Sequence, residues 1–198
     1  MEISEDITIR DREGVYSPDD DTYMLLDLVQ VEPDEDVLEI GCGSGIISLH
    51  CAEKGASVTA SDIDPSALEL TMENAELNGI ELEGILLSDL FENVVGTWEV
   101  IVFNPPYLPI DDRIKADRRW DGGKGGDETI LRFLNDAADH IHPDGRIYFC
   151  CSDMSPLTEI YKTIDDLYEI IEQKTKDYRF ETLYCFSLAP AFEYVDMY

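Results

Sequence analysis

The sequence that decides the fold is Asp36-Val37-Leu38-Glu39-Ile40-Gly41-Cys42-Gly43-Ser44-Gly45. Its first half is mostly apolar and is typical of a buried strand, whereas its second half is a glycine loop. Residues 46–54 follow with apolar side chains at helical spacing, and Gly55 ends that helix. The stretch therefore predicts a strand, a tight turn and a helix in immediate succession.

A second strand over 57–61 closes on Asp62, about twenty residues beyond the loop. Pro65 then opens a helix that runs to about Asn78, where Gly79 stops it. Strand, glycine loop, helix, strand and acid in this order are typical of a nucleotide-binding unit. We therefore predict that Asp62 accepts hydrogen bonds from ribose hydroxyls, and that the glycines let a ligand approach the backbone.

Strands and helices alternate along the rest of the chain. Apolar runs predict strands near 82–87, 99–103 and 146–151, and helical spacing predicts helices over 128–140 and 155–167. Segments 168–176 and 180–188 have the composition of strands, and the polar turn 177–179 joins them. They predict an antiparallel hairpin at the sheet edge.

The N-terminal part lacks a strand pattern. The first dozen residues have no clear period, so we expect an edge or a covering arm, and then a helix that Ser17 or Asp19 can cap. The predicted fold class is α/β: a doubly wound, mostly parallel, seven-stranded Rossmann-like sheet with an antiparallel C-terminal edge hairpin and helices on both faces. We expect one domain over 1–198, with an arm and helix over 1–30 and the sheet domain over 31–198.

Asn104-Pro105-Pro106-Tyr107 directly follows the buried strand over 99–103. The two prolines have ring-fixed φ angles, so the turn that leaves the strand is stiff. Asn104 offers an amide oxygen and an NH2 group, and Tyr107 offers a flat ring beside it. The motif therefore fits a planar amide or amino group, although Asn-Pro-Pro by itself also suits an ordinary turn.

Candidate ligand groups recur at the ends of successive predicted strands: Glu39 with the glycine loop, Asp62, Asp89 and Asn104. In an open α/β sheet, ligands bind outside the carboxyl ends of the strands. The strand order does not follow from one sequence, but the usual doubly wound order would bring these groups to one crevice. A surface role is the alternative for Asp62 and Asp89, because acidic residues are abundant in this chain.

Charge is the strongest compositional signal, since 14 basic and 44 acidic residues give 14 − 44 = −30. Such a charge destabilises a folded protein through self-repulsion, and the acids are spread along the chain. Molar salt screens this repulsion over a Debye length of about 3 Å. We therefore interpret the excess as halophilic adaptation to a salt-rich cytoplasm. An acidic surface for a basic partner is the alternative.

The five cysteines show no C-x-x-C spacing, and most fall in apolar runs. Buried free thiols in a reducing compartment explain them better than disulfides or zinc. The three histidines do not pair with them at ligand spacing, so we assign no metal. No apolar stretch approaches the length of a membrane span, and the acidic start differs from a signal peptide, so we expect a cytoplasmic protein.

Several segments between about residues 15 and 188 carry a resemblance to a known family. They are Tyr16-x-Pro18-x-x-Asp21-Thr22, Leu38-Glu39-Ile40-Gly41-x-Gly43-x-Gly45, Thr59-x-x-Asp62-Ile63-x-Pro65, Ser88-Asp89-Leu90, Val102-Phe103-Asn104-Pro105-Pro106-Tyr107, Trp120-x-Gly122-Gly123-x-x-Gly126 and Glu181-Thr182-Leu183. With these segments the chain resembles the class I S-adenosylmethionine-dependent methyltransferases. More closely, it resembles the HemK-type N5-glutamine methyltransferases of peptide chain release factors, in their archaeal and eukaryotic branch.

The resemblance implies roles for named residues. Asn104, Pro105, Pro106 and Tyr107 would hold the acceptor and form the catalytic motif. The cofactor S-adenosylmethionine would contact a larger set: Thr22, Glu39, Gly41, Gly43, Asp62, Asp89, Leu90 and Asn104. The bacterial members carry an N-terminal helical domain that recognises the release factor, and we expect this chain to work without one. The short branch works with a small zinc-binding activator subunit, so a heterodimer with an exposed apolar edge is implied.

The implied substrate is the glutamine of a Gly-Gly-Gln loop, whose NH2 group would donate to the Asn104 side-chain oxygen and the Pro105 carbonyl. Such contacts orient a weak nucleophile, and no strong base is needed before transfer. The same pair of hydrogen-bond acceptors also suits an exocyclic amino group of RNA or DNA, although a net charge of −30 opposes contact with phosphates. A non-catalytic scaffold that binds S-adenosylmethionine is the alternative of another class.

A basic cluster directly after the motif keeps the nucleic-acid alternative open. It could contact phosphates or a release factor, or form a solvated loop. Its members are Arg113, Lys115, Arg118, Arg119 and Lys124.

Overall fold

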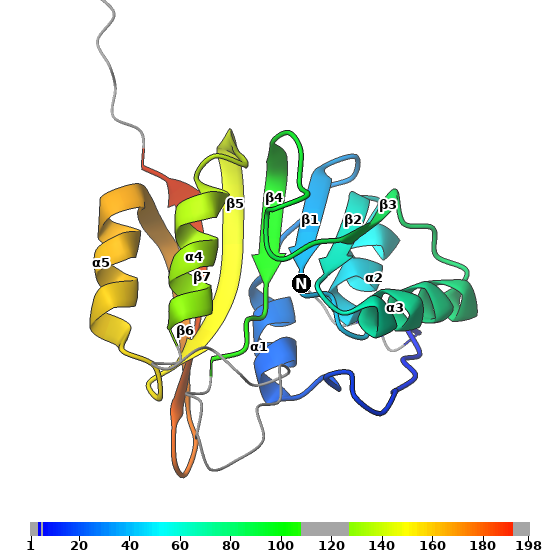
Figure 1. Ribbon diagram of the computed structural model, residues 1–198, viewed down its shortest axis with the longest axis horizontal. Helices are drawn as coiled ribbons and strands as arrows, with labels where there is room; N and C mark the ends of the chain where they lie inside the picture. The colour runs from blue at the N-terminus through cyan, green and yellow to red at the C-terminus, as the bar shows by residue number, and fades with distance from the viewer. Residues whose placement is uncertain (1–3, 5, 108–126, 192–198) are drawn as a thin grey trace, which may run out of the picture.

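The computed structural model describes residues 4, 6–107 and 127–191. Its centre is a seven-stranded sheet in the order β3-β2-β1-β4-β5-β7-β6 (Figure 1). The strands are β1 (Asp36–Ile40), β2 (Ser57–Asp62), β3 (Gly84–Leu87), β4 (Trp98–Phe103), β5 (Ile141–Ser152), β6 (Tyr168–Asp177) and β7 (Thr182–Pro190). The first five strands in this list are parallel where they pair, and β7 is antiparallel to both of its neighbours. The predicted mostly parallel sheet is confirmed.

Helices cover both faces of the sheet because side chains alternate along each buried strand. In β4, Val100 and Val102 pack in one core with helices α1 (Asp20–Leu28) and α2 (Ile46–Glu53). Ile101 and Phe103 point to the opposite face, where they pack with α4 (Glu128–Ala137) and α5 (Leu157–Leu167). Helix α3 (Pro65–Asn78) packs through Leu68 on Ala60 of β2. The strand that carries the motif is therefore buried on both sides.

The C-terminal hairpin forms as predicted, but only one of its strands lies at the sheet edge. β7 pairs with β5 on one side and with β6 on the other, so β6 is the outer strand. The hairpin strand was expected to begin at Phe180, whereas β7 begins at Thr182. Phe180 lies in the turn and is 82% exposed, which explains why its apolar character did not mark a strand position.

Strand β5 begins earlier than the sequence predicted. The strand was predicted near 146–151, but β5 runs from Ile141 to Ser152 and includes the turn-forming residues Pro143-Asp144-Gly145. The pairing with β4 jumps from Trp98↔Ile141 to Val100↔Arg146. The turn-forming residues therefore form an irregularity within the strand.

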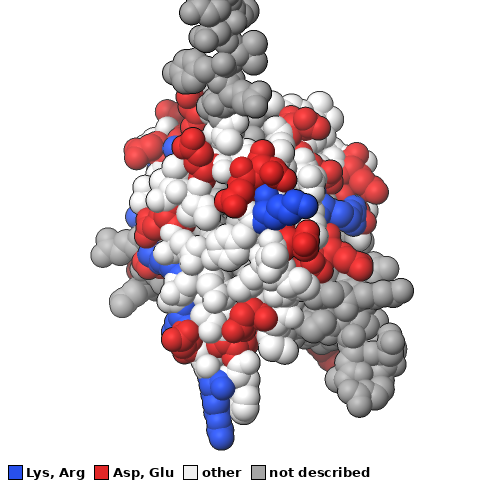
Figure 2. Space-filling model, turned by 90° about the vertical axis from the view of Figure 1, so that its left-hand side faces the viewer, with Lys and Arg blue, Asp and Glu red and all other residues white. Residues whose placement is uncertain are grey.

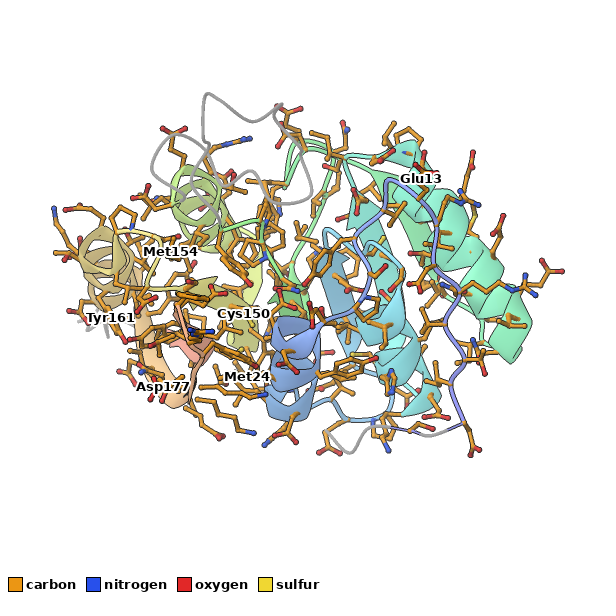
Figure 3. The ribbon with its side chains drawn as sticks, turned by 90° about the horizontal axis from the view of Figure 1, so that it is seen from below. Glu13, Met24, Cys150, Met154, Tyr161 and Asp177 are labelled. Atoms are coloured by element: carbon orange, nitrogen blue, oxygen red, sulfur yellow. The ribbon has the colours of Figure 1, made fainter. Side chains whose placement is uncertain are left out.

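The N-terminal segment is a covering arm, the second of the two forms that the sequence allowed. The backbone N–H groups of Thr8 and Arg10 donate to the side chains of Asn78 and Asn74, at 2.8 and 2.9 Å. Figure 3 shows this arm running along α3 from the side of Glu13. It covers the helix that follows β2, and it leads the chain back to the ends of the parallel strands.

All five cysteines are buried and free, as predicted. Within the described ranges, His, Cys, Asp and Glu side chains do not form a group that could hold a metal ion. No described helix combines the length and the apolar character that crossing a membrane requires.

Candidate active site

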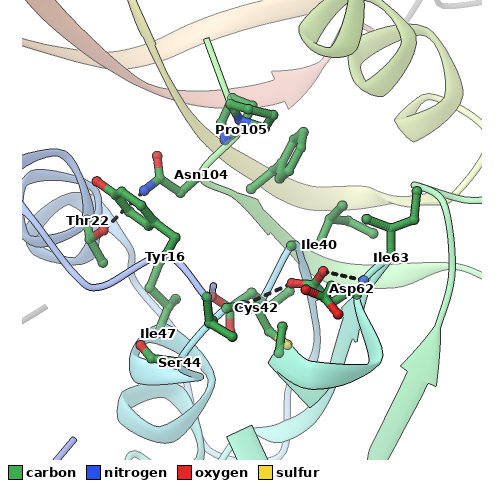
Figure 4. Close-up of a pocket in the computed structure, with 18 of the residues that line it drawn as sticks. Tyr16, Thr22, Ile40, Cys42, Ser44, Ile47, Asp62, Ile63, Asn104 and Pro105 are labelled. Atoms are coloured by element: carbon green, nitrogen blue, oxygen red, sulfur yellow. Dashed lines mark hydrogen bonds between the residues drawn. The ribbon is translucent and has the colours of Figure 1, made fainter. Parts of the chain in front are cut away.

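A pocket of about 550 Å³ opens at the carboxyl ends of β1, β2, β3 and β4 (Figure 4). This position follows from the topology, because parallel strands all end at the same edge of the sheet. Every residue that the sequence proposed for the site lines this pocket: Thr22, Glu39, Gly41, Gly43, Asp62, Asp89, Leu90, Asn104, Pro105, Pro106 and Tyr107. The structure thus brings the predicted site residues together, although they are spread over residues 22–107.

The glycine loop after β1 forms one wall of the pocket. Gly41 has a φ of 65°, and a Cβ atom there would lie 3.0 Å from the ring of Phe103. A Cβ atom at Gly45, whose φ is 80°, would lie 2.7 Å from Thr71. Side chains at either position would clash with these neighbours and strain the backbone, so glycine is required for the loop to adopt this conformation.

Asp62, at the end of β2, holds the glycine loop in place. Its Oδ2 accepts from the backbone N–H of Gly43 at 3.0 Å, and its Oδ1 accepts from that of Asp64 at 2.9 Å. Burial raises the pKa of Asp62 above its usual value. Each carboxylate oxygen has a second lone pair, so Asp62 can also accept hydrogen bonds from ligand hydroxyls in the pocket.

Glu39 is a buried carboxyl group beneath the glycine loop. It accepts from the backbone N–H of Ser48 at 2.8 Å and from the Ser48 hydroxyl, and thereby satisfies a donor in the first turn of α2. Burial raises the pKa of Glu39 to about 8. Its structural role at the start of α2 was not evident from the sequence.

The segment after β3 completes the far side of the pocket. Leu90 has a φ of 48°, which is uncommon for a residue with a side chain, and the Ser88 hydroxyl donates to the Leu90 carbonyl at 2.8 Å. Asp89 Oδ1 pairs with Arg132 Nη2 of α4 at 3.1 Å. Sequence reasoning missed Arg132, because nothing in its local sequence places it next to β3.

Asn104 lies at the end of β4, opposite the glycine loop. Its Nδ2 donates to Thr22 Oγ1 of α1 at 3.1 Å (Figure 4). Its Oδ1 is shielded from solvent and has no hydrogen-bond partner among the described residues. A buried carbonyl oxygen without a donor costs free energy, so the site is short of one hydrogen-bond donor at this position.

Asp21 is the main site residue that sequence reasoning missed. The sequence offered Ser17 or Asp19 as the helix cap, and Asp19 is indeed the N-cap of α1. Asp21 instead is buried and accepts from the Tyr16 hydroxyl at 2.7 Å and from the Tyr107 hydroxyl at 3.2 Å. The available signal was the early Tyr16-x-Pro18-x-x-Asp21-Thr22 segment, which the resemblance included without a role for Asp21.

Helix α1 reaches the site because it packs across β5. The Sγ atom of Cys150 lies 3.6 Å from the carbonyl oxygen of Asp21, and Figure 3 shows Cys150 beside this helix. The predicted Trp120-x-Gly122-Gly123 segment and the basic cluster over 113–124 lie outside the described residues.

The topology and the position of the pocket define a Rossmann-like methyltransferase. The methyltransferase small domain family matches residues 6–184, and the chain belongs to this family. The chain is 41% identical to the putative protein N5-glutamine methyltransferase MJ0928 of Methanocaldococcus jannaschii, over 82% of this chain and 83% of the relative. It is 31% identical to methyltransferase HEMK2 of Mus musculus, over 76% and 77% of the two chains. The crystal structure of the ribosomal protein L11 methylase from Lactobacillus delbrueckii subsp. bulgaricus, at 23% identity, has the same fold, with a TM-score of 0.71 over 93% of this chain and 86% of the other.

Proposed function

We propose that this protein transfers a methyl group from S-adenosylmethionine to the side-chain amide nitrogen of the glutamine in a release factor's Gly-Gly-Gln loop. The observation that carries the proposal is the unpartnered Oδ1 of Asn104 in the pocket, which can accept a hydrogen bond from an NH2 group. The name of the Methanocaldococcus jannaschii relative, a putative protein N5-glutamine methyltransferase, supports an amide acceptor in a protein. The Asn-Pro-Pro-Tyr motif supports it as well.

The residues of the pocket fit this cofactor. Gly41 and Gly43 of the glycine loop line the pocket, and Asp62 retains lone pairs for ribose hydroxyls. When bound, S-adenosylmethionine would supply a methyl group on a positively charged sulfur; as the C–N bond forms, the C–S bond would break, S-adenosylhomocysteine would leave, and the amide nitrogen would release one proton to solvent. We assign cofactor contacts to eight residues: Thr22, Glu39, Gly41, Gly43, Asp62, Asp89, Leu90 and Asn104.

Asn104 and the two prolines hold the acceptor. The Asn104 Oδ1 and the Pro105 carbonyl accept from the glutamine NH2 group, which orients the nitrogen and increases its electron density. The ring-fixed φ angles of Pro105 and Pro106 keep these acceptors in place, and Tyr107 borders the acceptor. Orientation of this kind lowers the activation barrier of methyl transfer by several kcal/mol. One preorganised polar group contributes about 3 kcal/mol.

The test is methyl transfer from labelled S-adenosylmethionine to four separate acceptors: release factor, its variant with the motif glutamine changed to alanine, tRNA and DNA. We expect label on the release factor alone. Label on tRNA or DNA would favour methylation of an exocyclic amino group. Cofactor binding without label on any acceptor would favour a non-catalytic scaffold, and label on the alanine variant would contradict the assigned glutamine.

We also propose that a small zinc-binding subunit pairs with the edge strand β3. The two edges of the sheet differ. β6 has a register irregularity near Ile170, a half-buried Lys174 and an exposed Lys176, which are features that discourage strand pairing. Both edges expose an apolar side chain, Leu87 at 51% on β3 and Ile171 at 63% on β6, but β3 lacks the irregularity and the lysines. Helix α3, which packs on β3, exposes Met72 and Leu77.

Two matched variants test this proposal: Leu87→Lys on β3 and Ile171→Lys on β6. We expect coexpression with the small subunit to improve solubility and activity, and Leu87→Lys to abolish copurification. Ile171→Lys should copurify as the unchanged chain does. A chain that is fully soluble and active alone would contradict the proposed heterodimer.

We further propose a halophilic cytoplasm as the compartment. Acidic side chains are spread over the face that includes β6 and α5, with few basic ones between them (Figure 2). The net charge of −30 and the buried free thiols support a salt-rich, reducing environment.

A further inference from the structure

The carboxylate of Asp21 organises the acceptor side of the pocket. Asp21 is only 4% exposed, and its oxygens accept from groups on three different segments. Oδ1 accepts from the Tyr16 hydroxyl at 2.7 Å, and from the backbone N–H and the hydroxyl of Thr22 at 2.6 and 3.2 Å. Oδ2 accepts from the Tyr107 hydroxyl at 3.2 Å. A buried carboxylate that accepts hydrogen bonds from four groups determines that each of these groups acts as a donor.

The two tyrosines remain donors in this arrangement. Burial raises the pKa of Tyr16 and of Tyr107, and the negative charge of Asp21 raises both further. Both hydroxyls therefore remain protonated and donate hydrogen bonds to Asp21. Tyr107 belongs to the acceptor motif, so the same carboxylate that contacts Thr22 also contacts this motif directly.

Proton counting at Thr22 extends the effect to Asn104. The hydroxyl of Thr22 has one proton, and it donates that proton to Asp21, because an ionised carboxylate only accepts. Toward Asn104, 3.1 Å away, Thr22 can then only accept. Asn104 must present its NH2 group to Thr22 and keep its Oδ1 for the acceptor. The reverse orientation of this amide would place two acceptor oxygens in contact.

We propose that Asp21 is a positioning residue that fixes the orientation of the Asn104 amide and thereby selects a substrate side chain that donates an N–H over one that only accepts. The inference rests on the proposed function and deepens it, because it explains how a glutamine is distinguished from a glutamate of nearly equal shape. Asp21 touches neither the reacting nitrogen nor the methyl group in this scheme. It acts through Thr22 and Asn104.

Asp21→Asn tests the proposal. An asparagine at position 21 can donate to the Thr22 hydroxyl, which then becomes free to donate to Asn104 Oδ1, so the Asn104 amide can rotate. We measure kcat for a Gly-Gly-Gln peptide, and the Kd of that peptide and of a Gly-Gly-Glu peptide, all at saturating S-adenosylmethionine. The wild type should prefer the glutamine peptide. In the variant, this preference and kcat should each fall by about tenfold or more. A change of this size is expected when one hydrogen bond to a charged group is misplaced.

Three further variants separate this role from a general loss of structure. Asp20→Asn makes the same charge change at an exposed neighbour on α1, and it should keep wild-type selectivity and kcat. Thr22→Val removes the relaying hydroxyl without changing Asp21, so it should lose selectivity as Asp21→Asn does, even if Asp21→Asn fails to fold. Thr22→Ser restores the hydroxyl and should restore selectivity.

The outcomes distinguish the inference from the proposed function. Wild-type enzyme that methylates the glutamine peptide, together with unchanged selectivity in Asp21→Asn or Thr22→Val, would overturn the role of Asp21 alone. Wild-type enzyme that binds cofactor but transfers nothing to the glutamine peptide would overturn both. Loss of selectivity in both variants, with retained selectivity in Asp20→Asn and Thr22→Ser, supports the inference.

Discussion

The backbone N–H of Gly43 donates to Asp62 Oδ2 across 3.0 Å, so the acid at the end of β2 holds the glycine loop at the end of β1. The second oxygen of Asp62 accepts from the N–H of Asp64, at the start of α3. One side chain thus joins the two loops that border the pocket. We expect cofactor affinity to depend on both functions of Asp62, because a displaced glycine loop would block the approach that its glycines permit.

Asp62→Asn should weaken binding of S-adenosylmethionine by about tenfold or more, since an asparagine can accept only one of the two backbone N–H groups and directs its NH2 at the other. Isothermal titration calorimetry measures this affinity. The exposed Glu83→Gln provides the control for loss of one negative charge and should bind as the wild type does. Unchanged affinity in Asp62→Asn would remove Asp62 from the cofactor site.

Asn104→Ala should lower kcat far more than it lowers cofactor affinity, because Asn104 is only one of eight assigned cofactor contacts; the loss of transition-state stabilisation is about 3 to 4 kcal/mol if Asn104 behaves as one preorganised polar group. The reason is that its unpartnered Oδ1 is the acceptor assigned to the glutamine NH2 group. Single-turnover methyl transfer measures the chemical step. Asn135→Ala, an exposed change on α4, is the control. Wild-type kcat in Asn104→Ala would exclude Asn104 from the reaction.

Glu39 should make stability depend on pH. Its pKa is raised from about 4.5 to about 8, so the folded state holds a proton that the unfolded state releases between these values. The stabilisation is fully present below about pH 4.5 and is lost as pH rises through about 8. Urea unfolding of the wild type and of Glu39→Gln should therefore show that the wild type loses more stability across this window. Parallel pH profiles for the two proteins would argue against a raised pKa.

Folding stability and activity should rise from low salt to molar KCl. The 44 acidic residues repel one another, and the Debye length falls to about 3 Å at molar ionic strength. Thermal unfolding at a series of KCl concentrations measures the effect. A series in sucrose, which stabilises compact states without screening charge, is the control. A melting temperature that does not change with KCl would contradict halophilic adaptation.

Sequence reasoning reached the parts of the site that depend on local chemistry. The glycine loop, Asp62 and Asn104 each directly follow a buried apolar run. Because parallel strands end at one edge of the sheet, a doubly wound strand order predicts that these groups meet in one pocket. The boundary errors arose where a local signal conflicted with the pairing of the sheet. Pro143-Asp144-Gly145 has turn chemistry, yet pairing with β4 includes this segment in β5 as an irregularity.

The sequence by itself determined which residues could bind and react, because strand ends, glycine turns and rigid proline turns are local properties of the chain. Only the tertiary structure decided how the polar groups are oriented. Asp21 meets Tyr107 across 86 positions, and Thr22 meets Asn104 across 82. These contacts depend on α1 packing across β5 and the motif leaving β4 beside it. The direction of a hydrogen bond is a property of the whole network of donors and acceptors, and that network exists only in the folded protein.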